Sequence, residues 1–244
     1  MLTLSWDEAG QLHTQSNLPL AADVQIHTSI TVDGHKVVTG LSMNFSTYIG
    51  PVLAVLFDPD TTDGKPIEYF DEVAGAIALD SALRAMTTIH AGQNYLAITP
   101  FTELATRLAL GQTHSAASDY AHVLNTPPEV TKLQEANQTV SKWLGVDIVG
   151  DLPTAVNDVT YLSQTNTAAK TYGDALAALS RLVPGTLLGG VEKLLTISAQ
   201  STGNTDTTVT ALLTQALTDY RSDVTGVTLT TVSFDAAVST KALL

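Results

Sequence analysis

The hydrophobic pattern of this chain changes its period once, near Thr99, and that change constrains the fold more than any other feature. Before it, short apolar runs alternate with polar residues or stand between turn residues. After it, apolar residues recur at every third or fourth position. Alternation suits a half-buried strand, and the wider spacing suits a helix with one apolar stripe. The sequence therefore predicts an α+β fold, with an N-terminal antiparallel β-sandwich (Ig-like or transthyretin-like) over residues 1–98 and a C-terminal α-helical bundle over residues 99–244.

The clearest predicted strand covers residues 23–32, where apolar and polar residues alternate strictly. Asp33 and Gly34 follow it and suit a two-residue hairpin turn, so residues 35–38 are expected to return as the partner strand. Further strand-like runs, each bounded by turn residues, cover residues 41–47, 52–57, 83–90 and 95–98. Several short strands separated by turn signals are typical of a small sandwich.

Thr99 is the expected N-cap of the first helix, with Pro100 at the first helical position and the Glu103 carboxylate complementing the helix dipole. A second helix is expected to begin at a capping box over residues 126–129 and to end at Gly145. Apolar stripes at helical spacing predict further helices around residues 172–183, 187–195 and 209–220, and a last short one over residues 234–244.

The composition excludes several classes of function. The chain has 244 residues, no cysteine and a formal net charge of -13, from 11 Lys and Arg against 24 Asp and Glu. Disulfides and thiolate metal sites are therefore excluded, and an acidic chain lacks the basic surface that nucleic acid requires. No stretch reaches the roughly 18 apolar residues of a membrane span, so membrane insertion is not expected. This acidic, threonine-rich, lysine-poor and cysteine-free composition resembles that of bacterial surface and secreted repeat proteins.

One segment joins the strand-rich half to the helical half: Ile98, Thr99, Pro100, Phe101, Thr102, Glu103, Leu104 and Ala105. Together with residues 50–55, 69–75, 83–85, 136–140, 144–147 and 172–180, it resembles a module of large bacterial extracellular and cell-surface adhesin-like proteins. In that module a strand-rich portion ends in a V-T-P-L-T-E-L-A segment that opens a helical portion. The resemblance covers most of residues 50–244, with Phe101 in place of the usual Leu and a longer loop at residues 58–66.

The resemblance implies an extracellular or cell-surface location and no catalytic role. We therefore expect a non-catalytic structural or adhesive module whose partners are copies of itself or other surface and matrix components. In a self-assembling version, the first strand-rich residues pair with an exposed sheet edge of a neighbour. No catalytic residue and no organic cofactor is assigned.

The candidate metal site is a loop that carries Asp58, Asp60, Asp63 and Gly64. Calcium prefers clusters of carboxylate oxygens of this kind. The third aspartate is displaced by one position from EF-hand spacing, so a solvated turn is the competing interpretation. If the loop binds calcium, the alternative function is a calcium-dependent module that binds a glycan or a peptide.

Other polar residues are expected to have structural roles. His114 and His122 lie two helical turns apart, too far to share one ion, so no zinc site is predicted. Asp71 and Glu72 are expected in a turn. Asn137 falls on an apolar helical stripe, where a buried amide must find partners, so its side chain is expected to bond the backbone of a neighbouring segment.

Overall fold

The computed structural model of this chain describes residues 2–6, 12–16, 23–30, 36–45, 49–57, 68–79, 81–111, 129–156, 161–200 and 205–225. Within them, strands occur up to Ala97 and helices from Pro100 onward. The predicted α+β class is therefore confirmed, and the secondary structure changes where the hydrophobic period changes. The division into two domains between residues 98 and 99 stays a prediction.

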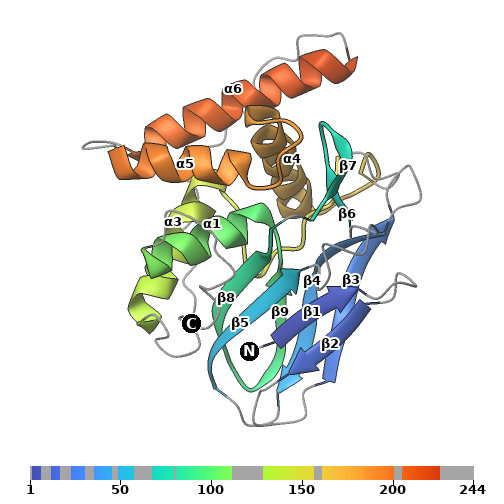
Figure 1. Ribbon diagram of the computed structural model, residues 1–244, viewed down its shortest axis with the longest axis vertical. Helices are drawn as coiled ribbons and strands as arrows, with labels where there is room; N and C mark the ends of the chain where they lie inside the picture. Colours follow the sequence, from blue (N-terminus) through green and yellow to red (C-terminus); the bar gives the residue numbers. More distant parts are fainter. Residues whose placement is uncertain are drawn as a thin grey trace.

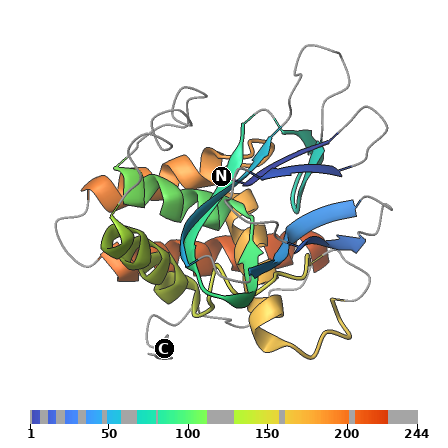
Figure 2. The same cartoon turned by 90° about the horizontal axis from the view of Figure 1, so that it is seen from below.

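The described strands form three sheets (Figure 1). The largest has the order β2-β1-β5-β8 and consists of β1 (Leu2–Trp6), β2 (Leu12–Ser16), β5 (Gly50–Phe57) and β8 (Leu83–Ile89). The second has the order β3-β4-β9 and consists of β3 (Asp23–Ile30), β4 (Lys36–Phe45) and β9 (Gly92–Ala97). The third is the hairpin of β6 (Glu68–Asp71) and β7 (Gly75–Ala78). Figure 2 shows the two larger sheets as separate layers, and their packing as a sandwich stays a prediction.

Most predicted strands occur, but the entirely antiparallel assignment is wrong. β3 and β4 form the expected antiparallel pair, and β4 joins two runs that were expected as separate strands. β1, in contrast, runs parallel to β5, with Leu2 opposite Ala54. Parallel neighbours need a long crossover connection, which the chain between Trp6 and Gly50 provides. Such a long-range pairing leaves no signal in the local pattern of residues.

The described helices are α1 (Pro100–Leu110), α3 (Val130–Leu144), α4 (Thr167–Leu182), α5 (Gly189–Gln200) and α6 (Thr205–Thr225). They coincide with the predicted apolar stripes, and Gly145, with a φ of 70°, ends α3 as expected. The capping box predicted before α3 is wrong, because the N-cap is Glu129 and its side chain makes no capping hydrogen bond. The helix expected at residues 234–244 lies outside the described residues. Packing of the helices as a bundle stays a prediction.

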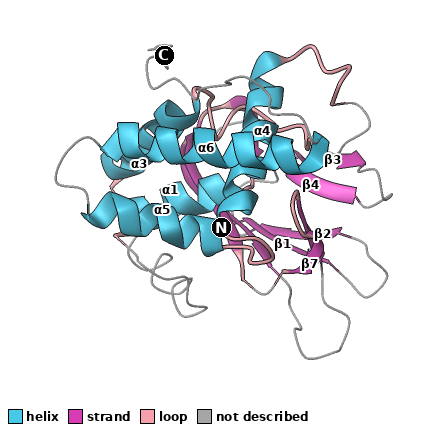
Figure 3. Cartoon of the chain, turned by 90° about the horizontal axis from the view of Figure 1, so that it is seen from above, coloured by secondary structure: helices cyan, strands magenta, loops and turns pink. Residues whose placement is uncertain are grey.

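One core connects the strands to the helices. Residues 83–86 of β8 are consecutive and all buried, so this strand is covered on both faces. A cluster of buried apolar side chains extends from β5 and β8 through α1 to α6. Seen from the helical end, α5 and α6 lie in front, with α1 and the strands behind them (Figure 3). None of the helices in the described ranges is long and apolar enough to cross a membrane.

Gly173 allows the segment that precedes α4 to lie directly against that helix. The Thr154 amide donates a hydrogen bond to the Ala169 carbonyl at 3.0 Å. A Cβ atom on Gly173 would lie 1.9 Å from the carbonyl oxygen of Thr154, which is less than any contact between real atoms permits. The glycine is therefore required by a close approach of two backbones.

We predict that Gly173→Ala destabilises the protein. Alanine is favoured over glycine in a helix interior by about 1 kcal/mol, so a helical site with free space would gain stability. Here the added methyl group forces the backbones apart, and we expect a net loss of about 1–3 kcal/mol in the free energy of unfolding. Urea denaturation followed by circular dichroism measures it. Unchanged or increased stability would contradict the close approach.

Candidate functional site

The predicted calcium ligands Asp58, Asp60 and Asp63 lie outside the described residues, as do His114 and His122. The calcium site therefore stays a prediction. Within the part of the chain that the structure describes, no group of three or more His, Cys, Asp or Glu side chains is arranged to hold a metal ion. The candidate site is built instead from buried polar side chains around the start of α1.

The N-terminus of α1 is capped as the sequence predicts. The Thr102 amide donates to Thr99 Oγ1 at 3.3 Å, and the Thr99 amide donates to Thr102 Oγ1 at 2.9 Å, while Pro100 occupies the first turn. Thr99 Oγ1 also lies 2.7 Å from the Tyr172 hydroxyl, which donates to the Ile148 carbonyl at 2.9 Å. Because the single Tyr172 proton is used there, Thr99 is the donor in their shared bond. The cap therefore also attaches α1 to α4.

Burial keeps the Tyr172 hydroxyl protonated, as this arrangement requires. Loss of water around the phenol raises its pKa well above the ordinary value, and the hydrogen bond from Thr99 opposes that shift only in part. Tyr172 therefore remains protonated, and remains a hydrogen-bond donor, at neutral pH.

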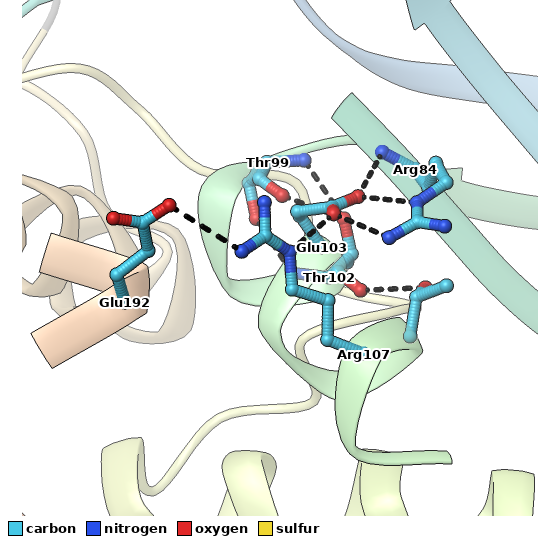
Figure 4. Close-up of polar contacts among 7 residues, drawn as sticks. Arg84, Thr99, Thr102, Glu103, Arg107 and Glu192 are labelled. Carbon is cyan, nitrogen blue, oxygen red and sulfur yellow. Dashed lines mark hydrogen bonds and ion pairs between the residues drawn. The ribbon is translucent and has the colours of Figure 1, made fainter. Parts of the chain in front are cut away.

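Glu103 forms a buried ion-pair network with two arginines (Figure 4). Its Oε2 atom accepts from the backbone amide and from Nε of Arg84, both at 2.9 Å. Its Oε1 atom accepts from Arg84 Nη2 at 2.7 Å and from Arg107 Nε at 2.8 Å. All three residues are 0% exposed. The sequence predicts only a helix-dipole role for Glu103, and the ion pairs with β8 and with the next turn of α1 are an additional role that it missed.

Arg84, Glu103 and Arg107 by themselves carry two positive charges and one negative charge. Nη1 and Nη2 of Arg107 are buried and make no hydrogen bond with the described residues. Among the described residues, Glu192 on α5 supplies a second carboxylate for Arg107: its Oε1 atom lies 3.9 Å from Arg107 Nη1, and its side chain is 56% exposed. A partly solvated carboxylate at this distance compensates the charge incompletely. Figure 4 shows Glu192 approaching Arg107 from α5, so the network also extends from α1 to α5.

A second polar cluster lies where the β6–β7 hairpin meets α4. Asp71 Oδ1 accepts from the amides of Val73 and Ala74, at 2.9 and 2.7 Å, which closes the turn that the sequence predicts. Ser180 Oγ donates to Glu72 Oε2 at 3.0 Å. Burial, and secondarily the charge of Asp71, raises the pKa of Glu72 from its ordinary value of 4.5 to about 8. Tyr69, Asp71 and Ser180 also line a cavity of about 10 Å³, which has room for one water molecule.

Two carboxylates attach α6 to the other helices. Asp206 accepts from Lys142 Nζ at 2.5 Å and from Trp143 Nε1 at 2.8 Å, and these bonds, the Lys142 bond first, lower its pKa. Asp174 on α4 accepts from the Tyr161 hydroxyl at 2.6 Å and from Arg221 Nη2 at 2.7 Å. The residues that these hydrogen bonds join lie between 13 and 64 positions apart in the chain, so no local sequence motif predicts the bonds.

The sequence does predict the role of Asn137. Its Nδ2 atom donates to the carbonyl oxygen of Met86 on β8 at 3.0 Å, so the amide bonds the backbone of a neighbouring segment as expected. Each of these clusters therefore includes at least one hydrogen bond that joins segments distant in sequence. These hydrogen bonds and ion pairs hold β8, α1 and the later helices in place against each other.

We predict that Glu103→Gln lowers the free energy of unfolding by about 3–5 kcal/mol, because it removes the buried negative charge that faces both guanidinium groups. The charge-free triple variant Arg84→Met, Glu103→Leu, Arg107→Met removes all three charges and is expected to recover most of that loss. Urea denaturation of both variants measures the difference. A Glu103→Gln protein within about 1 kcal/mol of the parent would contradict the network.

Asn137→Ala tests the bond from α3 to β8. The Met86 carbonyl would lose its amide donor in a partly buried position, so we expect a loss of about 1–3 kcal/mol in the free energy of unfolding. Gln138→Ala is the matched control, because Gln138 is the exposed neighbour on the same helix and should change stability by less than about 0.5 kcal/mol. Equal effects of the two substitutions in thermal unfolding would show that the amide bond is unimportant.

No protein-family model, no curated protein and no solved structure matches this chain. Its function is therefore inferred from its own residues and contacts.

Proposed function

We propose that this chain is a non-catalytic structural or adhesive module of a bacterial extracellular surface or matrix protein, and that it assembles with copies of itself through strand pairing. The proposal includes an N-terminal sandwich and a C-terminal helical bundle that act as one rigid spacer. Its main support is the buried network of Arg84, Glu103 and Arg107, which joins β8 to α1.

The roles of the junction residues agree with such a module. Thr99 and Thr102 cap α1, and Glu103 forms the buried ion pairs. These residues belong to the segment through which the chain resembles surface adhesin-like proteins, and each of them has a structural role. A module that spaces or adheres must keep its shape when it is pulled, and buried ion pairs between distant segments resist separation because breaking one leaves an uncompensated charge.

The composition supports an extracellular location. Eleven basic residues against 24 acidic ones give a charge of -13, which keeps such a protein soluble and limits non-specific adhesion. The chain has no cysteine, so it contains no thiol that an oxidising environment could crosslink wrongly. Both properties suit a protein that works outside the cell.

Self-assembly requires a sheet edge, and β2 offers one. β1 is flanked by β2 and by β5 of the same chain, so it is already paired on both sides. β2 ends the order of the four-stranded sheet among the described strands. An edge strand presents alternate N–H and C=O groups outward, and a strand of a neighbouring copy can pair with them. We therefore place the proposed contact at β2.

Proline substitutions at His13 and Thr14 test this contact. Neighbouring residues of a strand direct their N–H groups to opposite sides, so one of the two faces β1 and the other faces away from the sheet. Proline at the outward-facing position removes a donor for a neighbour and leaves the β1–β2 ladder intact. We expect the parent chain to associate with increasing concentration in sedimentation velocity, and one of the two variants to remain monomeric with an unchanged circular dichroism spectrum.

Two results would contradict the proposal. The first is a parent chain that stays monomeric at its highest soluble concentration. The second is association that persists unchanged in both folded proline variants, which would place the contact away from β2.

A further inference from the structure

The four-stranded sheet has two edges, β2 and β8, and different groups face them. Figure 1 shows β8 next to α1, and β2 on the side of the sheet away from the helices. A sheet edge carries N–H and C=O groups with which a strand of another molecule can pair. The state of each edge therefore decides how copies of this chain can join.

The edge of β8 is occupied by side chains of two helices. The backbone amide of Arg84 donates to Oε2 of Glu103 on α1 at 2.9 Å, so this amide points away from β5. Alternate residues of a strand direct their backbone groups to the same side, and the Met86 carbonyl accepts from Nδ2 of Asn137 on α3 at 3.0 Å. Two successive outward-facing positions of β8 therefore already have hydrogen-bond partners.

A new strand could not replace these partners without a large loss of stability. Glu103 also forms the buried ion pairs with Arg84 and Arg107, and all three residues are 0% exposed. A strand that paired with β8 would have to move Glu103 away, and a buried charge that loses its partner costs several kcal/mol. The β8 edge is therefore closed to strand addition at these positions.

The β2 edge has the properties that pairing with an identical strand requires. Its ladder with β1 is regular, from Leu2 opposite Ser16 to Trp6 opposite Leu12, and β2 has no second partner among the described strands. Its sequence, LHTQS, contains no Asp, Glu, Lys or Arg, although the whole chain has a charge of -13. Like charges opposite each other destabilise a strand pair, and two β2 strands bring none together.

The outer strand of the second sheet, β3, is less suited to strand addition. Its register with β4 shifts between His27 and Thr28, and its first residue is Asp23. A β-bulge bends and twists the strands around it, and natural edges use bulges and charges to resist addition. The regular, uncharged edge is therefore that of β2.

We infer that the chain forms a closed dimer in which β2 pairs antiparallel with β2 of a second copy, and that Glu103 and Asn137 block growth beyond two copies by closing the β8 edge. The inference rests on the proposed contact at β2 and specifies its partner. Pairing of β2 with β8 of the next copy would repeat without limit, because each added copy would offer a new edge. An isologous contact uses the same edge of both chains and stops at two.

Sedimentation equilibrium and amide hydrogen exchange on the full chain, in dilute and concentrated samples, test the dimer. We expect the mass to rise with concentration and to level off at twice that of one chain. The outward-facing amides of β2 should exchange about tenfold more slowly once about nine-tenths of the chains are paired, since exchange then occurs through the remaining monomer. The Arg84 amide should be as protected as that of Ala85, which faces β5, in both samples.

The outcomes separate this inference from the proposed self-assembly. A chain that stays monomeric at every concentration would contradict both. A mass that continues to rise beyond two copies would overturn the closed dimer and leave self-assembly standing, and pairing of β2 with β3 of another copy would give that result. An Arg84 amide that exchanges as fast as the β2 amides of the dilute sample would show that the β8 edge is open.

Cysteine cross-linking tests the antiparallel register, because the chain has no cysteine of its own. In an antiparallel pair of identical strands one residue lies opposite its own copy, and full overlap of β2 places Thr14 there. Directly opposed residues are close enough for a disulfide. We expect Thr14→Cys to form a disulfide-linked dimer on mild oxidation, and Gln138→Cys, at an exposed position on α3, to remain a monomer in a denaturing gel.

His13→Cys and Gln15→Cys complete the series, since a pair displaced along the strand places one of these residues opposite itself. Association without a cross-link in any of the three β2 variants would overturn the β2 pair. Equal cross-linking of Gln138→Cys would also overturn it, because the disulfides would then form by random collision.

Discussion

The carboxylate of Glu103 fixes how the strands and the helices meet. It is enclosed by Arg84 of β8 and Arg107 of α1, and its two oxygens accept four hydrogen bonds from them. A buried charge that loses its partner costs several kcal/mol, so α1 cannot shift along β8 without a large penalty. The cap at Thr99 and the bond from Asn137 to Met86 hold the same region from two other directions, through α4 and α3. The junction is therefore the part of the molecule on which the positions of the later helices depend.

Two carboxyl groups in the described part of the chain have different surroundings. Glu103 is fully buried between two guanidinium groups, which makes its contacts a link between β8 and α1. Glu72 is only partly buried, and it accepts a hydrogen bond from Ser180 of α4. In the proposed surface module, the junction formed by Glu103 and its two arginines would carry load.

Much of the secondary structure was predictable, because its signals are local. The alternation in residues 23–32, the cap at Thr99 and the stop at Gly145 each depend on a few neighbouring residues. The parallel pairing of β1 with β5 was not predictable, because it joins segments that are separated by more than forty residues. The local pattern of each segment does not identify its partner strand. The same holds for the candidate site. The role of Asn137 was predictable because it is a polar residue on an apolar helical stripe. For Glu103 the local sequence indicated only a helix-dipole role, and its partner Arg84, 19 residues earlier, was not predicted.

Native-state hydrogen exchange across the junction tests the central claim most directly. If the Glu103 network unites strands and helices, the slowest amides of β5, β8, α1 and α4 should exchange through the same global opening, with one common free energy that falls equally for all of them as urea is added. Strand amides that exchange at a clearly lower free energy, while the helices remain protected, would show that the two parts open independently and that the network does not join them.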